Sequence, residues 1–182
     1  MAEPTEPQML ILGHGYSAGF LTPLLREAGW QVAGTTRSRR AEVAAAGAEP
    51  LIWPGEEAAI RDRIASADAI LVSAAPGAEG DPVLAAFADD LRRASPRWFG
   101  YLSTTGVYGD RGGDWVTEDS PLEPSTTRSQ ARVEAEAAWQ RMGLPLHIFR
   151  LAGIYGPGRG PFEKVRNGTA RLIVKPGQVF SR

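Results

Sequence analysis

The sequence predicts an α/β fold in which helices cover both faces of a doubly wound, parallel β-sheet. Short apolar segments alternate along the chain with segments of helical periodicity, which is the pattern of βαβ crossovers. The apolar segments are also continuous rather than alternating with polar residues, as strands buried on both faces require. We therefore expect a Rossmann-type sheet, whose ligands bind beyond the carboxyl ends of the strands.

Six strands and six helices are expected in alternation. The strands are expected at residues 9–12, 31–36, 49–53, 69–74, 98–103 and 146–149. The helices are expected at residues 17–28, 39–46, 56–66, 82–94, 125–142 and 162–166. A long polar loop is expected at residues 110–124, before the longest helix.

Residues suited to helix ends support these bounds. Asp81 can cap the fourth helix, with Pro82 at its first position, and Ser38 can cap the second. Gly29 and Gly47 follow the first two helices, where glycine readily takes the left-handed conformation that ends a helix. We therefore expect the helices to stop at these glycines.

The first helix is expected to have one apolar face. This face is expected to comprise Phe20, Leu21, Leu24 and Leu25. Pro23 is compatible with the helix only if it lies near the first turn, because proline has no N–H to donate.

The composition narrows the classes of function. The 182 residues include 20 Lys and Arg against 21 Asp and Glu, which excludes the basic surplus of a broad nucleic-acid surface. No apolar run approaches the roughly 18 residues of a membrane span. The absence of cysteine excludes disulfides, thiolate metal sites and a cysteine nucleophile, and two histidines do not favour a histidine-rich metal centre. We expect a soluble, cytoplasmic protein whose partner is a small molecule, neither nucleic acid nor a membrane; a homodimer remains open.

The length predicts one domain, at roughly 150 residues per domain. Residues 1–8 are acidic, contain proline and lack the features of a secretory signal, so we expect a disordered tail there. The Rossmann-type domain is expected to span residues 9–170.

A glycine-rich turn follows the first strand and opens the first helix. Residues 13–18 fit the dinucleotide-binding pattern G-x-G-x-x-A in the context that this pattern requires. Gly13 permits the tight turn, Gly15 lets the backbone approach a diphosphate, and Ala18 allows close helix–strand packing. The N–H groups of the first helical turn, which includes Tyr16 and Ser17, are available to phosphate oxygens.

The same turn also fits G-x-S-x-G, the nucleophile elbow of α/β-hydrolases, with Ser17 as nucleophile. A hydrolase needs a histidine on a later loop, and the only later histidine, His147, falls in a strand that we expect to be buried, with its ring packed and a nitrogen satisfied. We therefore favour the dinucleotide interpretation over a hydrolase or a merely structural glycine turn. His14 is expected on the solvent side of the turn.

The end of the second strand favours NADP over NAD. NAD-binding folds expect an Asp or Glu about 20 residues after the turn, but no acid occurs here before Glu42. Arg37 is the best candidate to bind a 2′-phosphate, with Thr36 and Arg40 behind it, because a guanidinium forms charge-assisted bonds to phosphate. Alternatively, Arg39 and Arg40 form only a solvated helix start.

Two further motifs, at residues 102–109 (LSTTGVYG) and 150–159 (RLAGIYGPGR), follow the fifth and sixth strands. Together with the glycine-rich turn, they resemble the extended short-chain dehydrogenase/reductase superfamily, the NAD(P)-dependent epimerase/dehydratase group, and above all its atypical bacterial members. The resemblance extends over nearly the whole chain from Met9 onward.

The resemblance implies roles for several residues. Thr104, with Ser103 adjacent, occupies the position of the hydroxyl that helps to polarise the substrate. It also implies two segments that contact the cofactor, formed by Ala74, Ala75 and Pro76 and by Ala152, Gly153 and Ile154. We expect Tyr108 and Tyr155 to serve in packing.

The chain departs from the family at the catalytic Tyr-x-x-x-Lys pair. Aligning Glu136 with the family's glutamate places Arg128 at the Tyr and Arg132 at the Lys. Arg132 can still supply charge to the cofactor's ribose, but Arg128 cannot act as a general acid because arginine stays protonated. Alternatively, Arg132 pairs with Glu136 on a solvated helix face. If hydride chemistry occurs, another acid must serve; the candidates are Asp114, Glu118 and Asp119.

Two functions therefore remain open. The first is an NADP-dependent oxidoreductase or epimerase acting on a small polar, sugar-like substrate, and the second is a non-catalytic NADP-binding sensor or scaffold. Members of the family usually continue for about a hundred residues as a smaller substrate-binding lobe, a typical size for a small domain. We therefore expect residues 171–182, in which Val179 and Phe180 have no obvious partner, to be the start of a missing or truncated lobe.

Overall fold

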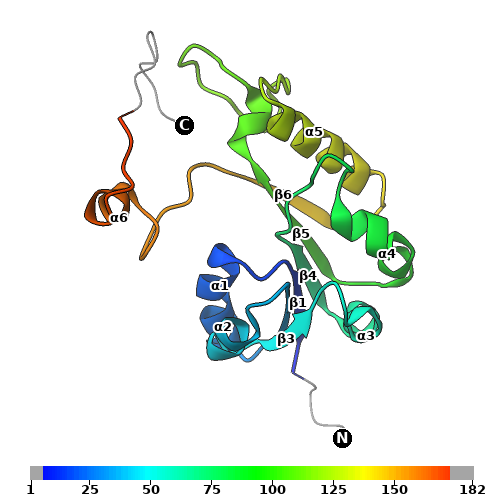
Figure 1. Cartoon of the computed structure of the whole chain (residues 1–182). Coiled ribbons are helices and arrows are strands. Elements are labelled where there is room, and N and C mark those ends of the chain that lie inside the picture. Colours follow the sequence, from blue (N-terminus) through cyan, green and yellow to red (C-terminus); the bar gives the residue numbers. More distant parts are fainter. Residues whose placement is uncertain (1–5, 173–182) are drawn as a thin grey trace, which may run out of the picture.

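The structure, a computed structural model, describes residues 6–172. Its centre is a six-stranded parallel sheet with the strand order β3-β2-β1-β4-β5-β6 (Figure 1). The strands are β1 (Gln8–Leu12), β2 (Gln31–Thr36), β3 (Glu49–Ile52), β4 (Ala69–Val72), β5 (Trp98–Thr104) and β6 (Leu146–Leu151). The doubly wound Rossmann-type fold predicted from the sequence is therefore confirmed.

Helices lie on both faces of this sheet. They are α1 (Tyr16–Glu27), α2 (Arg40–Ala45), α3 (Glu57–Ser66), α4 (Pro82–Arg93), the short 3₁₀ helix η1 (Thr105–Tyr108), α5 (Thr127–Gln140) and α6 (Pro161–Arg166). In Figure 1, α1 and α2 lie on one side of the sheet and α3, α4 and α5 on the other. Helix α6 follows β6 in the chain and contributes no buried residue.

The larger core lies between the sheet and the side covered by α3, α4 and α5. Its largest side chains are Phe87, Phe99, Tyr101 and Trp139, and the Trp139 ring packs 5.0 Å from the ring of Phe99. A smaller core lies under α1 and α2, where Ala18 and Val43 meet the strands. The two cores explain why the central strands read as continuous apolar segments.

The apolar face predicted for α1 is right for Leu21 and Leu25 but wrong for Phe20 and Leu24. Phe20 and Leu24 are 51% and 62% exposed, whereas Ala18 and Thr22 are buried and Leu21 and Leu25 pack against the core. The buried side has the helical spacing i, i+3, i+4, i+7 from Ala18 onward. Because this series includes the small Ala18 and the polar Thr22, the buried side of the helix cannot be recognised from large apolar side chains alone.

Pro23 also lies where we did not expect it, in the interior of α1. Proline removes the N–H that would bond to the carbonyl of Gly19. Pro23 is on the exposed side of the helix, where water can satisfy that carbonyl. The helix continues beyond it, since the N–H of Ala28 donates to the carbonyl oxygen of Leu24 at 3.1 Å.

One of the two expected N-caps is confirmed. The Asp81 carboxylate accepts from the backbone N–H groups of Val83 and Leu84 at 2.9 and 3.2 Å, and also from the indole N–H of Trp139 at 2.9 Å. Ser38 is not a cap, because α2 starts after Arg39 and its first turn has no side-chain cap.

Strand β6 is less buried than predicted. His147 is exposed and Phe149 is 41% exposed, because β6 is the edge strand and α1 and α2 do not reach over it. The His147 ring stacks on Trp98 at 5.8 Å, and its Nδ1 lies 3.2 Å from the carbonyl oxygen of Pro145. The ring is therefore packed, as expected, but not buried.

The chain ends are described in part. Strand β1 begins at Gln8, and the N–H of Gln31 donates to the carbonyl oxygen of Pro7, so residues 7 and 8 belong to the fold. Residues 1–5 of the expected tail lie outside the described residues. So do residues 173–182 of the expected further lobe, which include Val179 and Phe180.

Candidate nucleotide-binding site

The glycine-rich turn is fixed by its contacts with two neighbouring strands. Gly13 has φ +98°, and its N–H donates to the Thr35 hydroxyl at 2.8 Å. A Cβ atom on Gly13 would lie only 2.7 Å from the backbone nitrogen of Ala74. Both the left-handed backbone and the close approach therefore require glycine at this position.

The turn lies at the switch point of the sheet. Strand β1 pairs with β2 on one side and β4 on the other, so the chain leaves the centre of the sheet in opposite directions. Such a switch point is where open α/β sheets bind ligands. Helix α1 begins directly after Gly15 without a side-chain cap, so its first N–H groups are not satisfied by a capping side chain.

Two cavities flank this turn. The β2-side cavity has a volume of about 540 Å³ and is lined by Gly13, His14, Gly15, Thr35, Thr36, Arg37, Ser38, Arg39, Trp53, Pro54, Ala74, Ala75 and Pro82. The β6-side cavity has a volume of about 400 Å³ and is lined by Ser17, Ala18, Leu21, Leu71, Leu102, Leu151, Ala152, Gly153 and Ile154. An elongated ligand that crosses the turn could therefore occupy both.

The arginines after β2 differ in their surroundings. Arg37 is exposed at the β2-side cavity and forms no hydrogen bond or ion pair within residues 6–172. Arg39 also lines the cavity and donates to the carbonyl oxygen of His14 at 3.1 Å and to Glu42 at 3.0 Å. Arg40 does not line the cavity, because its guanidinium donates to the carbonyl oxygen of Pro50 and pairs with Glu56.

The sequence did not identify two residues that follow β3. Trp53 and Pro54 line the β2-side cavity, and the Trp53 ring packs 5.3 Å from the ring of Phe87. Their position directly after a strand, at the carboxyl edge of the sheet, was the signal that could have found them. Four residues near this cavity were predicted to contact the cofactor. The cavity is lined by three of them, Thr36, Ala74 and Ala75, and not by Pro76.

His14 points into the protein rather than toward solvent, so that prediction is wrong. Its side chain is 5% exposed, and its Nε2 lies 2.8 Å from the Thr22 hydroxyl. The ring fills the space that Gly34 leaves on β2, where a Cβ atom would approach its Cδ2 to 2.6 Å. Burial lowers the pKa of His14 below its usual 6.5, and the charge of Arg39 contributes in the same direction.

Thr104 ends β5 and is the N-cap of η1. Its hydroxyl oxygen accepts from the backbone N–H of Gly106 at 3.1 Å, which leaves the hydroxyl proton available to another partner. Ser103 differs, because it is buried and its hydroxyl donates to the Glu136 carboxylate. The geometry therefore favours Thr104 over Ser103 as a residue that could contact a substrate.

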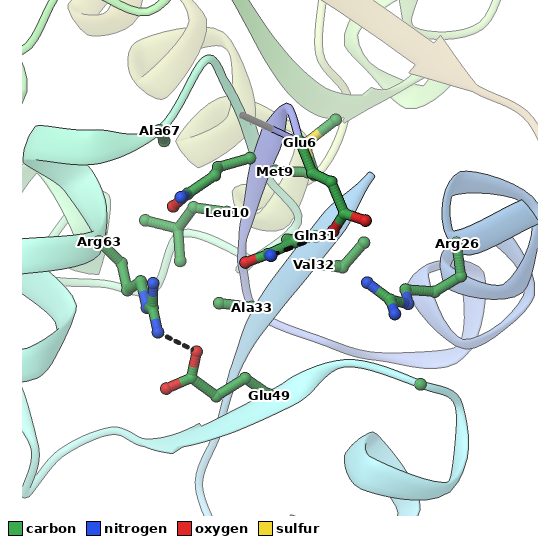
Figure 2. Close-up of a pocket in the computed structure, with 12 residues that line it drawn as sticks. Glu6, Met9, Leu10, Arg26, Gln31, Val32, Ala33, Glu49, Arg63 and Ala67 are labelled. Carbon is green, nitrogen blue, oxygen red and sulfur yellow. Dashed lines mark hydrogen bonds and ion pairs between the residues drawn. The ribbon is translucent and has the colours of Figure 1, made fainter. Parts of the chain in front are cut away.

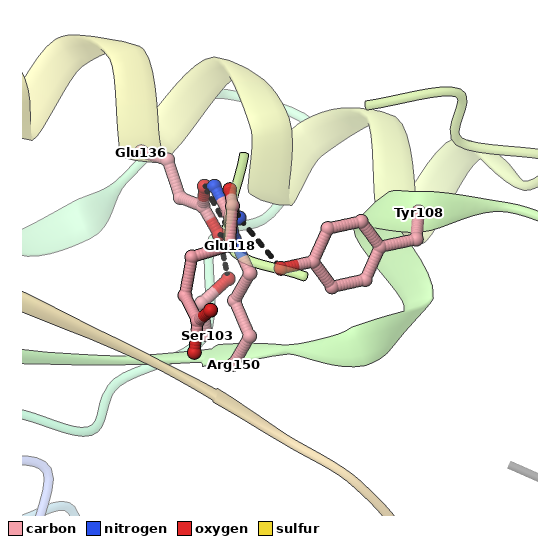
Figure 3. Close-up of polar contacts among 5 residues, drawn as sticks. All are labelled: Ser103, Tyr108, Glu118, Glu136 and Arg150. Carbon is pink, nitrogen blue, oxygen red and sulfur yellow. Dashed lines mark hydrogen bonds and ion pairs between the residues drawn. The ribbon is translucent and has the colours of Figure 1, made fainter. Parts of the chain in front are cut away.

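A half-buried ion pair, between Arg150 and Glu136, connects β6 to α5 (Figure 3). The Arg150 guanidinium donates to the Glu136 carboxylate at 2.9 Å, to the Tyr108 hydroxyl at 2.8 Å and to the Glu118 carbonyl oxygen at 3.0 Å. The hydrogen bond to Glu136 is the main cause that raises the pKa of Arg150 above its ordinary value. Tyr108 is buried in this network, consistent with the packing role that we expected for it.

Arg132 lies inside the fold. Its guanidinium donates to the Tyr101 hydroxyl at 2.9 Å and to the Leu102 carbonyl oxygen at 2.8 Å. Burial raises the pKa of Tyr101 to about 12, so this phenol stays protonated near neutral pH. Arg132 does not pair with Glu136, whose partner is Arg150. Arg128 is exposed at the start of α5.

The other candidate acids lie on the exposed loop at residues 110–124. Asp114, Glu118 and Asp119 are all exposed, and none of them lines either cavity. Tyr155 is 84% exposed, so the packing role that we expected for it is wrong.

The hydrolase interpretation places its parts at opposite edges of the sheet. Ser17 follows the carboxyl end of β1, whereas His147 is the second residue of β6, at the amino edge. His14 is buried against Thr22. The structure therefore brings no histidine of residues 6–172 into a Ser-His arrangement with Ser17.

A third cavity, of about 270 Å³, lies at the amino edge of the sheet (Figure 2). Its charged side chains are engaged with one another or with backbone. Arg63 pairs with Glu49, Arg26 donates to the carbonyl oxygen of Trp30, and Glu6 accepts from Gln31. Within residues 6–172, no cluster of side chains could hold a metal ion and no helix is long and apolar enough to cross a membrane.

The fold and the switch-point turn define a Rossmann-type α/β protein. Comparison with known proteins narrows this class, although no model of a protein family matches the chain. The chain is 29% identical to protein YeeZ of Escherichia coli K12, over 85% of this chain and 61% of YeeZ.

Solved structures give higher similarity. A conserved protein of unknown function from Silicibacter pomeroyi is 50% identical, with a TM-score of 0.87, over 96% of this chain and 62% of that chain. A protein from Methylobacillus flagellatus, described as an NAD-dependent epimerase/dehydratase, is 28% identical, with a TM-score of 0.73, over 90% of this chain and 59% of that chain.

The structural neighbours of this chain thus include members of the NAD-dependent epimerase/dehydratase group, as the sequence motifs predicted. UDP-glucuronic acid 4-epimerase from Bacillus cereus, solved with NAD, shares the fold alone at 16% identity, with a TM-score of 0.74 over 88% of this chain and 63% of that chain. The chain spans about three fifths of the length of these relatives.

Proposed function

We propose that this chain binds NADP(H) and serves an oxidoreductase or epimerase reaction on a small polar, sugar-like substrate. One observation carries the preference for NADP. Among residues 6–172, the side chains that line the β2-side cavity include Arg37, Ser38 and Arg39 and no carboxylate.

The charge at this cavity suits a 2′-phosphate. A carboxylate at the end of β2 would bond to a free ribose 2′-OH and repel a phosphate, whereas a guanidinium does the opposite. Arg37 forms no ion pair within the described residues, so its charge is available to a ligand. NAD is the cofactor named for neighbours such as the Bacillus cereus epimerase, and the arginines of this cavity are our reason for proposing NADP here.

The two cavities suit the two halves of a dinucleotide. The turn between them has glycine at the positions of closest backbone approach, and the loop at residues 152–154 lines the far cavity. A bound nicotinamide would supply hydride transfer. Among the chain's own residues, Thr104 would donate a hydrogen bond to a substrate oxygen, and Ser103, Glu136 and Arg150 would hold the strand end that carries it.

A non-catalytic NADP-binding sensor or scaffold is the alternative. One observation favours it, namely that the guanidinium of Arg132 bonds to Tyr101 and Leu102 inside the fold. Neither Arg132 nor the exposed Arg128 can act as a general acid.

The test is a fluorescence titration of the purified chain with NADPH and, separately, NADH. We expect NADPH to bind more tightly than NADH. Binding of both weaker than about 1 mM, which corresponds to roughly −4 kcal/mol, would contradict the proposal. NADPH oxidation in the presence of small aldehydes, ketones and sugars then separates the enzyme from the sensor.

A further inference from the structure

The turn at residues 156–159 is fastened to the first residue of α1. Gly156 and Arg159 exchange two backbone hydrogen bonds of 2.9 Å, which close the turn. The Tyr16 hydroxyl donates to the carbonyl oxygen of Pro157 at 3.0 Å, and the Arg159 guanidinium lies 5.2 Å from the centre of the Tyr16 ring. We call Tyr16 and residues 156–159 the Tyr16 clasp.

The Tyr16 side chain packs closely against the turn at residues 156–159. A Cβ atom on Gly156 would lie 2.5 Å from the Tyr16 hydroxyl oxygen, so a larger residue could not approach in the same way. The Tyr16 ring also contacts the Phe20 ring at 5.0 Å. The aromatic side chain is therefore held by its own helix and by a turn 141 residues later in the sequence.

The clasp is attached to the turn between the two cavities. Gly15, before Tyr16, lines the β2-side cavity, and Ser17, after it, lines the β6-side cavity. A dinucleotide in both cavities would carry its diphosphate across this point. Arg159 brings a positive charge to this point, and no carboxylate within residues 6–172 pairs with it.

We propose that Arg159 binds the diphosphate of the dinucleotide and that Tyr16 positions it. This inference rests on the proposed function, because it requires a dinucleotide that crosses the turn. A guanidinium stacked on an aromatic face keeps its N–H groups at the edge, where they can donate charge-assisted bonds to phosphate oxygens. Arg159 would thus hold the part of the cofactor that NADP and NAD share.

The test compares three probes, NADPH, NADH and 2′-AMP, which has no diphosphate. We expect Arg159→Ala to weaken NADPH and NADH by the same factor, about ten-fold, and to leave 2′-AMP binding unchanged. The matched control is Arg166→Ala, because Arg166 is an exposed arginine of the next helix, α6, that pairs with Glu163. This control should bind all three probes like the wild type.

Tyr16→Leu tests the positioning role. It should cause a similar loss for both dinucleotides, and the double variant should lose little more than either single variant, because the two residues act as a unit. Wild-type affinity for both dinucleotides in Arg159→Ala would overturn the inference, as would an equal loss of 2′-AMP. If the wild type binds none of the three probes, the proposed function is wrong. This result differs from one in which the wild type binds the dinucleotides and Arg159→Ala binds them equally well, which would contradict only the role of Arg159.

Discussion

At the scale of single residues, the three arginines after β2, Arg37, Arg39 and Arg40, show what the sequence does and does not determine. The absence of an acid between the end of β2 and Glu42 was evident from the sequence. The sequence did not show which arginine lines the cavity, because Arg39 and Arg40 bind different partners although they are neighbours at the start of α2. Arg39 bonds to the turn, and Arg40 bonds to the segment after β3.

Arg37→Ala should weaken NADPH binding about ten-fold or more and change NADH binding little. The reason is the loss of a charge-assisted bond to the 2′-phosphate, of about 1.5–3 kcal/mol. The measurement is fluorescence titration of each nucleotide. Arg40→Ala is the control, since Arg40 does not line the cavity and should leave the preference for NADPH unchanged. Equal losses of both nucleotides in Arg37→Ala would remove Arg37 from the phosphate site.

His14 should make the stability of the chain depend on pH. Its pKa is lowered by burial, so below pH 6.5 the unfolded chain takes up a proton that the folded chain resists. The free energy of unfolding should thus be highest above pH 6.5. It should decrease as the pH falls toward the lowered pKa, by at most about 1.4 kcal/mol for each unit of the shift.

The measurement is urea unfolding of the wild type and of His14→Gln at several pH values between 8 and 5. His14→Gln removes the titrating group and keeps a polar side chain that can reach Thr22. Its stability should decline less over this range than that of the wild type. The same decline in both proteins would exclude His14 as the cause.

At the scale of elements, the sequence located the strands and helices but not all of their faces. Continuous apolar segments predicted all six strands, and the bounds differ by at most two residues. Burial of α1 depends instead on Ala18 and Thr22, which carry no strong apolar signal. The half-exposed face of β6 could not be foreseen either, because it results from the order of strands rather than from the strand's own composition.

Asp81→Ala should lower the free energy of unfolding by about 2–4 kcal/mol. The change removes the N-cap of α4, about 1 kcal/mol, and leaves the buried indole N–H of Trp139 without its acceptor. Urea unfolding measures the difference. Ser38→Ala is the control and should be nearly neutral, because Ser38 caps no helix. An Asp81→Ala chain as stable as the wild type would contradict the cap and the bond to Trp139.

At the scale of the whole molecule, the sheet is covered unevenly. On the side of α1 and α2, the helices lie over β1, β2 and β3, and no helix within residues 6–172 packs over β5 and β6 on that side. Trp98 and Phe149 contact each other there, with ring centres 6.1 Å apart. An apolar surface of this kind attracts other apolar groups.

Phe149→Asp should therefore reduce binding of the dye 8-anilinonaphthalene-1-sulfonate and leave NADPH affinity unchanged, because Phe149 lines neither cavity. Dye fluorescence and NADPH titration measure the two effects. Trp115→Ala is the control, since this exposed aromatic lies on the loop at residues 110–124, away from the sheet. A greater loss of dye in the control than in Phe149→Asp would contradict the assignment of the surface.

The candidate site, like the fold, could be predicted from the sequence only in part. The turn at residues 13–18 was found because the conformation of its backbone requires glycine, which is visible in the sequence. Thr104 was named from the resemblance to a family motif. Arg159 was not found, since only the packing of distant segments brings it to the turn. Trp53 and Pro54 were missed, although their position directly after a strand was a usable signal. The interior position of Arg132 depends on Tyr101, 31 residues earlier, and no local pattern reveals that hydrogen bond.

The position of β1 at the centre of the sheet has a consequence for synthesis of the chain. Strand β1 is made first, but one of its two neighbours, β4, is reached only about 60 residues later, as the bond between Gln8 and Asp68 shows. During that interval one edge of β1 has no partner strand, and pairing of such distant segments is intrinsically slow. A nascent chain that stalls before β4 should therefore be more prone to aggregate than one in which β4 has paired with β1.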